Sequence, residues 1–207
     1  IMTRKRGTYF ALGAVLLAAV VVAQNKLNYV ASTLENLKAA YTGELAARTR
    51  YEAYAARADE EGYAGVASLF RAVARSEGIH AANHEKAVKA LGSAAVADIR
   101  EPAVRSTREN LEWVIAAENR EYHSLYPGFI EQALAENNVQ ALESFRGAMA
   151  SEGGHLNLFT RAAIALEEWR EKRSFLVCRT CGHTTANFGL EKCPFCSRGR
   201  EQFKEYN

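Results

Sequence analysis

The chain has few prolines, few cysteines and a small net charge. Only three prolines occur in 207 residues, while alanine is abundant, and this combination favours helices over a β-sheet fold. Lysine and arginine number 26 against 24 acidic residues, so the net charge of +2 is too small to indicate a nucleic-acid-binding surface. We therefore expect no nucleic-acid partner. With 48% hydrophobic residues, the chain can form one domain with a substantial core and smaller additions.

The four cysteines form two pairs, Cys178-x-x-Cys181 and Cys193-x-x-Cys196. Two disulfides in a secreted protein are one interpretation. The spacing is more typical of two short turns that offer four thiolates to one tetrahedral metal site, which suits iron or zinc. Because residues 174–207 can bury little core, a bound metal would supply much of their folding free energy. The sequence therefore predicts a small metal-binding domain at 174–207.

Residues 1–26 combine a basic cluster at positions 4–6 with an uncharged run. As a helix, Thr8–Ala23 would reach roughly 24 Å, slightly short of a hydrocarbon core of about 30 Å. The segment could be a signal peptide with a cleavage site at Ala23, a membrane anchor, or a core helix, but it lacks the polar face of the last. We expect an uncleaved membrane anchor. The basic cluster would then lie on the cytoplasmic side and the metal domains on the extracytoplasmic side.

Hydrophobic residues spaced at three and four predict helices over much of 27–173. The expected helices run from about 27 to 61, 66 to 91, 104 to 134 and 139 to 173. Gly62 and Gly65 would separate the first two, and Pro127-Gly128 would interrupt the third. The connection at 93–103 is long enough to cross a bundle. The expected fold class is therefore all-α, a four-helix bundle.

An internal duplication organises these helices. Two E-x-x-H motifs, at 77–80 and 152–155, lie 75 residues apart, and a lone glutamate precedes them by 33 and 34 residues respectively. Residues three apart on a helix project from one face, so each motif presents a carboxylate and an imidazole together. Two such helices and two lone carboxylates could surround two metal ions inside the bundle. The candidate ligands are Glu44, Glu77, His80, Glu118, Glu152 and His155.

Glu121 breaks the repeat, because the equivalent position of the first copy is Ala47. It is either a seventh ligand, which gives one ion more carboxylate than the other, or a solvated charge. We expect the E-x-x-H glutamates to bridge the ions, the other three glutamates to bind terminally, and each histidine to bind one ion. His84, one turn beyond His80, could lie just outside the ligands or on the surface, and we expect the surface.

From about Leu34 to Tyr206 the chain resembles rubrerythrin. The resemblance rests on both E-x-x-H motifs, both cysteine pairs and three further stretches: Leu37-Lys-Ala-Ala-Tyr-Thr-Gly-Glu44, Glu118-Asn-Arg-Glu121-Tyr and Tyr126-Pro-Gly-Phe129. It implies a ferritin-like di-iron domain at 27–173 followed by a rubredoxin-like domain at 174–207, with two Fe in the first and one Fe, or Zn, in the second. Glu121 distinguishes such sites from bacterioferritin-like ones.

The resemblance implies a peroxidase that reduces hydrogen peroxide to water and protects against oxidative stress. Electrons would return through the four-cysteine iron site from an external reductase or rubredoxin. The chain would be a homodimer, in which one subunit's four-cysteine site lies near the other's di-iron site. The family implies catalytic roles for three residues: Glu121, which exchanges with His80 as an iron ligand, and Tyr51 and Tyr126, which lie just outside the ligands.

Two other functions fit the same motifs. One is a ferritin-like ferroxidase or iron-handling protein, in which oxygen is the oxidant. The other is a membrane-bound accessory subunit whose metal sites are structural.

Overall fold

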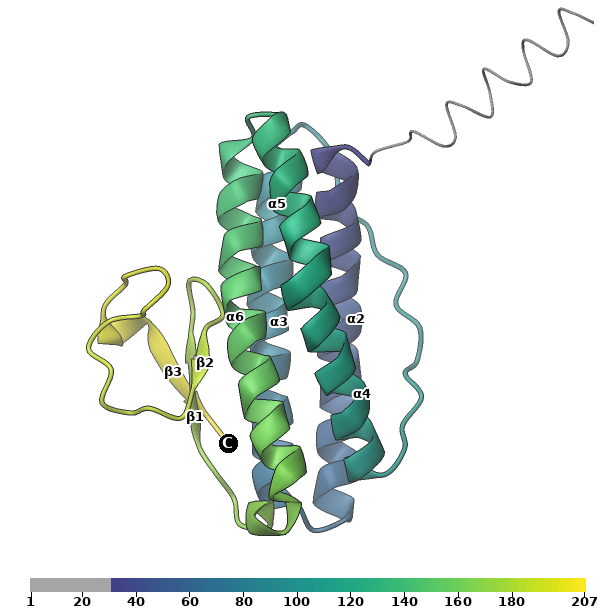
Figure 1. Cartoon of the computed structure of the whole chain (residues 1–207), viewed down its shortest axis with the longest axis vertical. Helices are drawn as coiled ribbons and strands as arrows, with labels where there is room; N and C mark the ends of the chain where they lie inside the picture. Colours follow the sequence, from purple (N-terminus) through teal and green to yellow (C-terminus); the bar gives the residue numbers. More distant parts are fainter. Residues whose placement is uncertain (1–30) are drawn as a thin grey trace, which may run out of the picture. The chain divides into compact units, whose positions relative to one another are not determined.

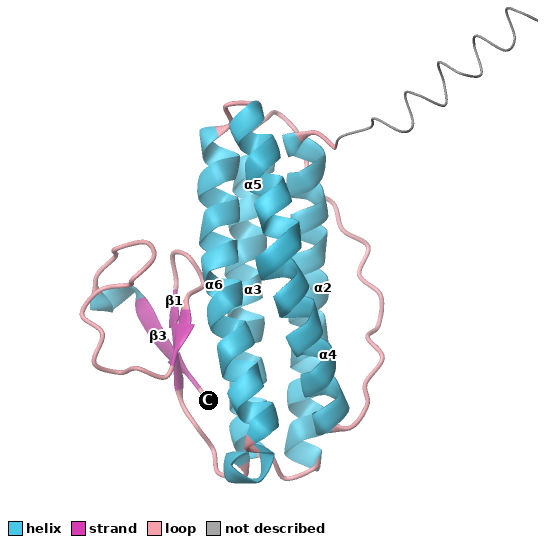
Figure 2. Cartoon of the chain, in the orientation of Figure 1, coloured by secondary structure: helices cyan, strands magenta, loops and turns pink. Residues whose placement is uncertain are grey.

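The structure, a computed structural model, describes residues 31–207, which form a four-helix bundle and a small three-stranded module (Figures 1 and 2). This agrees with the all-α class and the small C-terminal module expected from the sequence. The elements are α2 (Thr33–Glu60), α3 (Ala64–Ala90), α4 (Thr107–Arg120), a π-helical turn (Glu121–Leu125), α5 (Tyr126–Ala135), α6 (Val139–Ile164), a 3₁₀ turn (Leu166–Trp169), β1 (Phe175–Cys178), β2 (Thr184–Thr185), a 3₁₀ turn (Arg200–Gln202) and β3 (Phe203–Tyr206).

Side chains fix where α2 and α4 begin. Ser32 accepts a hydrogen bond from the backbone N–H of Glu35, and the Glu35 carboxylate accepts one from the N–H of Ser32. Ser106 and Glu109 form the same capping box at α4. Each box pairs two backbone donors that a helix start would otherwise leave free. The helices therefore begin at 33 and 107, a few residues later than the hydrophobic pattern predicted.

The connections produce a bundle with one long crossover. A tight turn with Gly62 at φ +77° joins α2 to α3, while residues 91–106 cross the bundle from α3 to α4 (Figure 1). Gly65 was expected to separate the first two helices but lies inside α3. A Cβ there would lie 2.5 Å from the Glu171 carbonyl oxygen and 2.8 Å from that of Trp169. Glycine at 65 thus permits the segment after α6 to pack closely on α3.

The predicted interruption at Pro127-Gly128 is instead a π-helical turn, Glu121–Leu125, and Pro127 lies in the first turn of α5, where its missing N–H is harmless. A π turn inserts one residue into a helix. This insertion explains why the lone glutamate precedes its E-x-x-H motif by 33 residues in the first copy and by 34 in the second. The turn begins at Glu121, the residue that has no acidic counterpart in the first copy.

Two apolar clusters fill the bundle. One gathers around Tyr51, Phe70 and Phe159, and the other around Tyr126 and Phe145. The buried carboxylates and imidazoles form a polar layer between the clusters, although burying an unpaired charge costs several kcal/mol. Such a layer needs compensating positive charge.

Helix α6 ends earlier than expected, at Ile164 and not near 173. A 3₁₀ turn reverses the chain, and β1 then runs back along the bundle. The sheet is antiparallel with the order β2-β1-β3, and β1 contacts α3 while β2 contacts α6 (Figure 1). Bundle and module belong to one compact unit, Ser32–Asn207. The domain boundaries given above remain predictions.

The predicted localisation at a membrane is wrong. Among residues 31–207, no helix combines the length and apolarity needed to cross a bilayer. The segment on which that prediction rested, residues 1–26, lies outside the residues that the structure describes.

Candidate dimetal and four-cysteine sites

The two E-x-x-H motifs meet in the middle of the bundle, where α2 and α4 add the lone glutamates. Their ligand atoms form two groups, and within each group all atoms lie within 4.8 Å of one another. Glu77 and Glu152 belong to both groups, as expected of carboxylates that bridge two ions. The first group is completed by Glu44 and His80, and the second by Glu118 and His155. None of the six residues is more than 3% exposed.

The pocket has the donor chemistry of a cation site. His80 Nδ1 lies 2.9 Å from a Glu77 oxygen and 3.1 Å from a Glu152 oxygen. Yet this nitrogen and oxygens of Glu77, Glu118 and Glu152 are buried without a properly oriented hydrogen bond. Buried polar atoms rarely lack a partner. Metal ions would satisfy all four atoms, and carboxylates with imidazoles suit iron.

The pKa values show how the metal-free pocket balances its negative charge. Burial lowers the pKa of His80 and His155, but neighbouring carboxylates, Glu152 and Glu77 first among them, raise both well above the usual range. Burial and the charge of Glu152 raise the pKa of Glu118 to about 7. Protons thus occupy the pocket when metal is absent. Metal ions would displace these protons on binding.

Two tyrosines hold the lone glutamates in place. The Tyr51 hydroxyl donates to Glu118 Oε1 at 2.5 Å, and the Tyr126 hydroxyl donates to Glu44 Oε1. Burial, together with these carboxylates, raises the pKa of both phenols well above the usual value. Both tyrosines are therefore protonated donors, one for each half of the pocket.

The four cysteines lie together as free thiols and not as disulfides. Cys178 Sγ lies 3.6 Å from Cys196 Sγ, and Cys181 Sγ lies 3.5 Å from Cys193 Sγ. This arrangement offers four sulfur ligands to one metal ion. Phe203 packs against the sulfurs. Phe188 and Phe195 are exposed, and Phe175 and Tyr206 pack in the bundle core.

The Cys181 turn rests on the dimetal pocket of its own chain. The Cys181 carbonyl oxygen lies 3.2 Å from His80 Nε2, and Thr184 Oγ1 lies 3.3 Å from His155 Nε2. Ser76 donates to the Gly182 carbonyl at 2.6 Å. Because a carbonyl oxygen only accepts, it fixes the Nε2–H tautomer of neutral His80 and leaves Nδ1 free to bind metal. The resemblance implied such proximity between two subunits; a contact within one chain was not predicted, since no motif reports how two modules pack.

Comparison with known proteins identifies the family. A family model described as Rubrerythrin matches residues 35–173. The chain belongs to the rubrerythrin family. Nigerythrin of Nitratidesulfovibrio vulgaris is 34% identical over 178 residues, which cover 86% of this chain and 88% of nigerythrin. Rubrerythrin-2 of Clostridium acetobutylicum is 31% identical over 182 residues, which cover 85% of this chain and 97% of that protein.

Solved structures agree. Fully reduced, all-ferrous nigerythrin superimposes with a TM-score of 0.80 over 86% of this chain and 89% of its own. A bacterioferritin of Desulfovibrio desulfuricans, 19% identical, has a TM-score of 0.61 over 67% of this chain and 82% of its own, which shows a shared ferritin-like fold. Rubrerythrin-family proteins use a di-iron centre and a rubredoxin-like iron site, and both ligand clusters of this chain suit these cofactors.

Glu121 lies outside both ligand groups of this rubrerythrin-family chain. It is half-buried on the π turn. Burial and the charge of Glu118, with smaller contributions from three other glutamates, raise its pKa to about 10. It is therefore not a solvated surface charge. The structure places it near the pocket but not within it.

His84 was expected on the surface, but its side chain is fully buried. Its Nε2 lies 3.2 Å from the Tyr126 hydroxyl oxygen, and its Nδ1 lies 2.7 Å from Ser144 Oγ. Burial lowers the pKa of His84, although Glu44 partly opposes this shift. One turn from His80 on the same face, it was a candidate for the pocket from its spacing alone.

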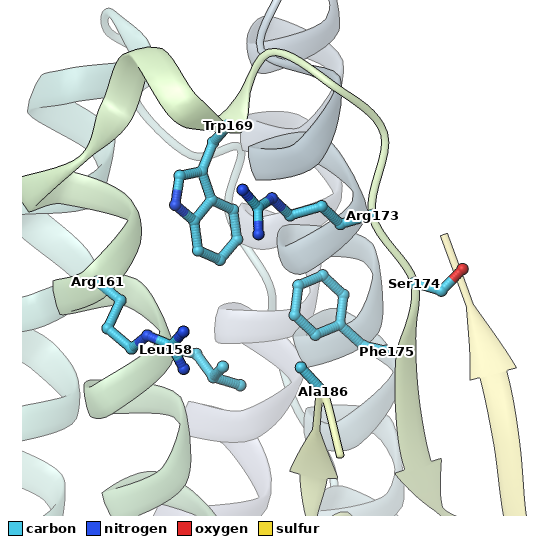
Figure 3. Close-up of a pocket in the computed structure, with 7 residues that line it drawn as sticks. All are labelled: Leu158, Arg161, Trp169, Arg173, Ser174, Phe175 and Ala186. Carbon is cyan, nitrogen blue, oxygen red and sulfur yellow. The ribbon is translucent and has the colours of Figure 1, made fainter. Parts of the chain in front are cut away.

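A cavity of about 240 Å³ lies near the start of the module, between α6 and the chain that leads into β1 (Figure 3). Its lining includes Leu158 and Arg161 from α6. Across from them lie Trp169 and Phe175, with the Arg173 guanidinium 4.4 Å from the Trp169 ring centroid. The cavity contains no candidate metal ligand, so it is separate from both sites.

Proposed function

We propose that this chain is a di-iron peroxidase that reduces hydrogen peroxide to water and so protects against oxidative stress. The proposal is carried by the buried carboxylate–imidazole pocket that touches a four-cysteine module. An iron-storage protein needs the dimetal pocket but has no evident use for an electron-carrying four-cysteine site in contact with the histidines of that pocket. Peroxide cleavage takes up two electrons and two protons and yields two water molecules, with the O–O bond broken. Two ferrous ions, when bound, would supply the two electrons.

The chain's own residues would have distinct parts in this reaction. Glu77 and Glu152 would bridge the ions, and the remaining ligands would bind one ion each. Tyr51 and Tyr126 would hold the terminal carboxylates in fixed positions, while the two apolar clusters keep bulk water from the pocket. Glu121 would exchange with His80 as a ligand, as the family resemblance implies. Its place at a π turn is consistent with such movement, because π turns frequently occur at functional sites.

We further propose that electrons reach the pocket from the four-cysteine module of the same chain, loaded with iron. Cys181 supplies both a sulfur ligand and the carbonyl that contacts His80, so a single residue joins the two sites. An external reductase or rubredoxin would recharge the module. The homodimer remains a proposal, but this contact requires no second subunit.

Anaerobic stopped-flow mixing of the reduced, iron-loaded protein with peroxide tests the function. We expect rapid oxidation of the dimetal site, slowed strongly by Glu121→Ala. Glu112→Ala, an exposed glutamate of α4, is the matched control and should leave the rate unchanged. Faster oxidation by oxygen than by peroxide, with mineral formation under added Fe(II), would favour the ferritin-like alternative. Zinc in both sites of the native protein would favour a structural role.

A further inference from the structure

The two halves of the pocket differ in the residues that pack behind Tyr51 and Tyr126, that is, around each tyrosine on the side away from the glutamate to which it donates. The duplication relates Phe70 to Phe145, each of which packs beside one of the two tyrosines, with ring centroids 6.0 and 6.2 Å apart. The same 75-residue offset relates His84 to Phe159 and Ser144 to Leu69. Behind Tyr51 the chain therefore places hydrocarbon, whereas behind Tyr126 it places a histidine and a serine.

The hydrogen bonds behind Tyr126 have only one consistent direction. Tyr126 donates its proton to Glu44, so its oxygen must accept from His84 Nε2, 3.2 Å away. His84 Nδ1 then lacks a proton and accepts from Ser144 Oγ at 2.7 Å. Ser144, His84, Tyr126 and Glu44 thus form a continuous chain from α6 through α3 and α5 to α2. All four are buried.

The other half has no such chain. Tyr51 packs edge-on against Phe159, with ring centroids 5.6 Å apart, and against Phe70. Among the described residues, the only hydrogen-bond partner that its hydroxyl has is Glu118. His84 instead lies nearly parallel to the Tyr126 ring, with an interplanar angle of 25° and centroids 6.0 Å apart. The Tyr126 phenol is consequently held by packing and by a second hydrogen bond.

We propose that His84, oriented by Ser144, is a positioning residue that fixes Tyr126 as the donor to Glu44 and thereby strengthens metal binding in the Glu44–His80 half of the pocket alone. Hydrogen bonds in a chain strengthen one another in a buried setting. Partners outside the ligands typically change metal affinity by about 10–100-fold. This inference rests on the dimetal pocket of the proposed function, but not on peroxide as the substrate.

The test is cobalt binding. Co²⁺ is titrated calorimetrically into the full chain with an empty dimetal pocket, after its four-cysteine site has been filled with zinc. His84→Phe combined with Ser144→Leu recreates the residues behind Tyr51, so it leaves no buried polar atom unpaired. We expect about tenfold weaker binding of one of the two ions and no change for the other. The single variant His84→Gln, whose amide can still donate to Tyr126, should bind both ions with close to wild-type affinity.

Two double-mutant comparisons decide whether His84 acts through Tyr126. In a Tyr126→Phe chain, adding His84→Phe and Ser144→Leu should weaken binding no further, because the phenol through which His84 acts is already gone. In a Tyr51→Phe chain, the same two substitutions should bring their full separate loss at the Glu44–His80 half of the pocket. Additive loss with Tyr126→Phe, or wild-type affinity in the double variant, would overturn the inference. If the wild-type chain bound no pair of ions, the dimetal pocket itself, and with it the proposed function, would fail.

Discussion

Replacing Gly182 by alanine tests the contact between the four-cysteine module and the dimetal pocket. Gly182 has φ +83°, in the left-handed region, and an added Cβ would overlap His80 Nε2 and lie 2.7 Å from Ser76 Oγ. The left-handed conformation costs alanine about 1–2 kcal/mol. Loss of the Ser76–Gly182 and His80–Cys181 hydrogen bonds would cost about 1 kcal/mol each. The substitution should therefore destabilise the docked state by about 3 kcal/mol.

Two assays measure this loss in protein with both sites filled. For a domain of this size, about 3 kcal/mol corresponds to a Tm lower by about 6–12 °C in calorimetry. The undocked fraction should rise about a hundredfold, since each 1.4 kcal/mol is tenfold. After mixing with peroxide, the absorption of the iron–sulfur chromophore in the module should consequently return more slowly than in the wild type.

Gly154→Ala is the matched control at the same interface. Its Cβ would lie 3.8 Å from the Thr184 carbonyl oxygen, an ordinary contact, and alanine favours the helix. We expect an unchanged or slightly higher Tm. Ser76→Ala removes one hydrogen bond without backbone strain and should give a smaller loss than Gly182→Ala. An unchanged Tm and an unchanged electron-transfer rate in Gly182→Ala would refute the docking.

Three further predictions follow from the same structure. Mixing a Cys178→Ser chain with a Glu77→Ala chain should restore no rapid peroxide-driven oxidation of the four-cysteine iron site, because in the proposed route each module donates electrons only to the pocket of its own chain. Recovery in the mixture would indicate electron transfer between subunits. In urea unfolding, the metal-free chain should lose stability as pH rises from about 5 to 8. The pKa of Glu118 is raised to about 7 in the folded state, so its contribution to the free energy of unfolding is complete below the unfolded value near 4.5 and is lost as pH rises through 7, by roughly 3 kcal/mol. The raised pKa of His80 acts in the same direction. Filling the pocket with metal should remove this pH dependence of stability. Finally, Gly65→Ala should lower the Tm through its clash with the Trp169 and Glu171 carbonyls, whereas Gly43→Ala, which meets nothing within 4 Å, should not.

Local patterns in the sequence were enough to predict both ligand clusters. An E-x-x-H motif places its two ligands on one helix face whatever the surroundings, and C-x-x-C does the same for a metal-binding turn. The structure accordingly brings together six of the seven candidate carboxylate and imidazole ligands, all but Glu121, and all four cysteines. Even the one-residue difference between the two copies was visible in the sequence, although only the structure showed that it is a π turn.

Helix ends were less predictable, because they depend on caps and on packing across the chain. Hydrophobic spacing continues past Ile164, yet the 3₁₀ turn after it lets Leu166 and Trp169 join the bundle core. Gly65 resembled a helix break, but its function is to admit a neighbouring backbone. His84 lacks any motif, and only the packing of three helices buries it beside Tyr126.

The sequence by itself determined which residues can bind metal, since ligand chemistry and helical or turn spacing are local properties. Tertiary structure alone decided the contacts between elements: the Cys181 carbonyl at His80, the hydrogen bonds that end on Glu44, and the position of Glu121 beside the pocket. These contacts join residues far apart along the chain, and their geometry depends on how whole helices and the module pack.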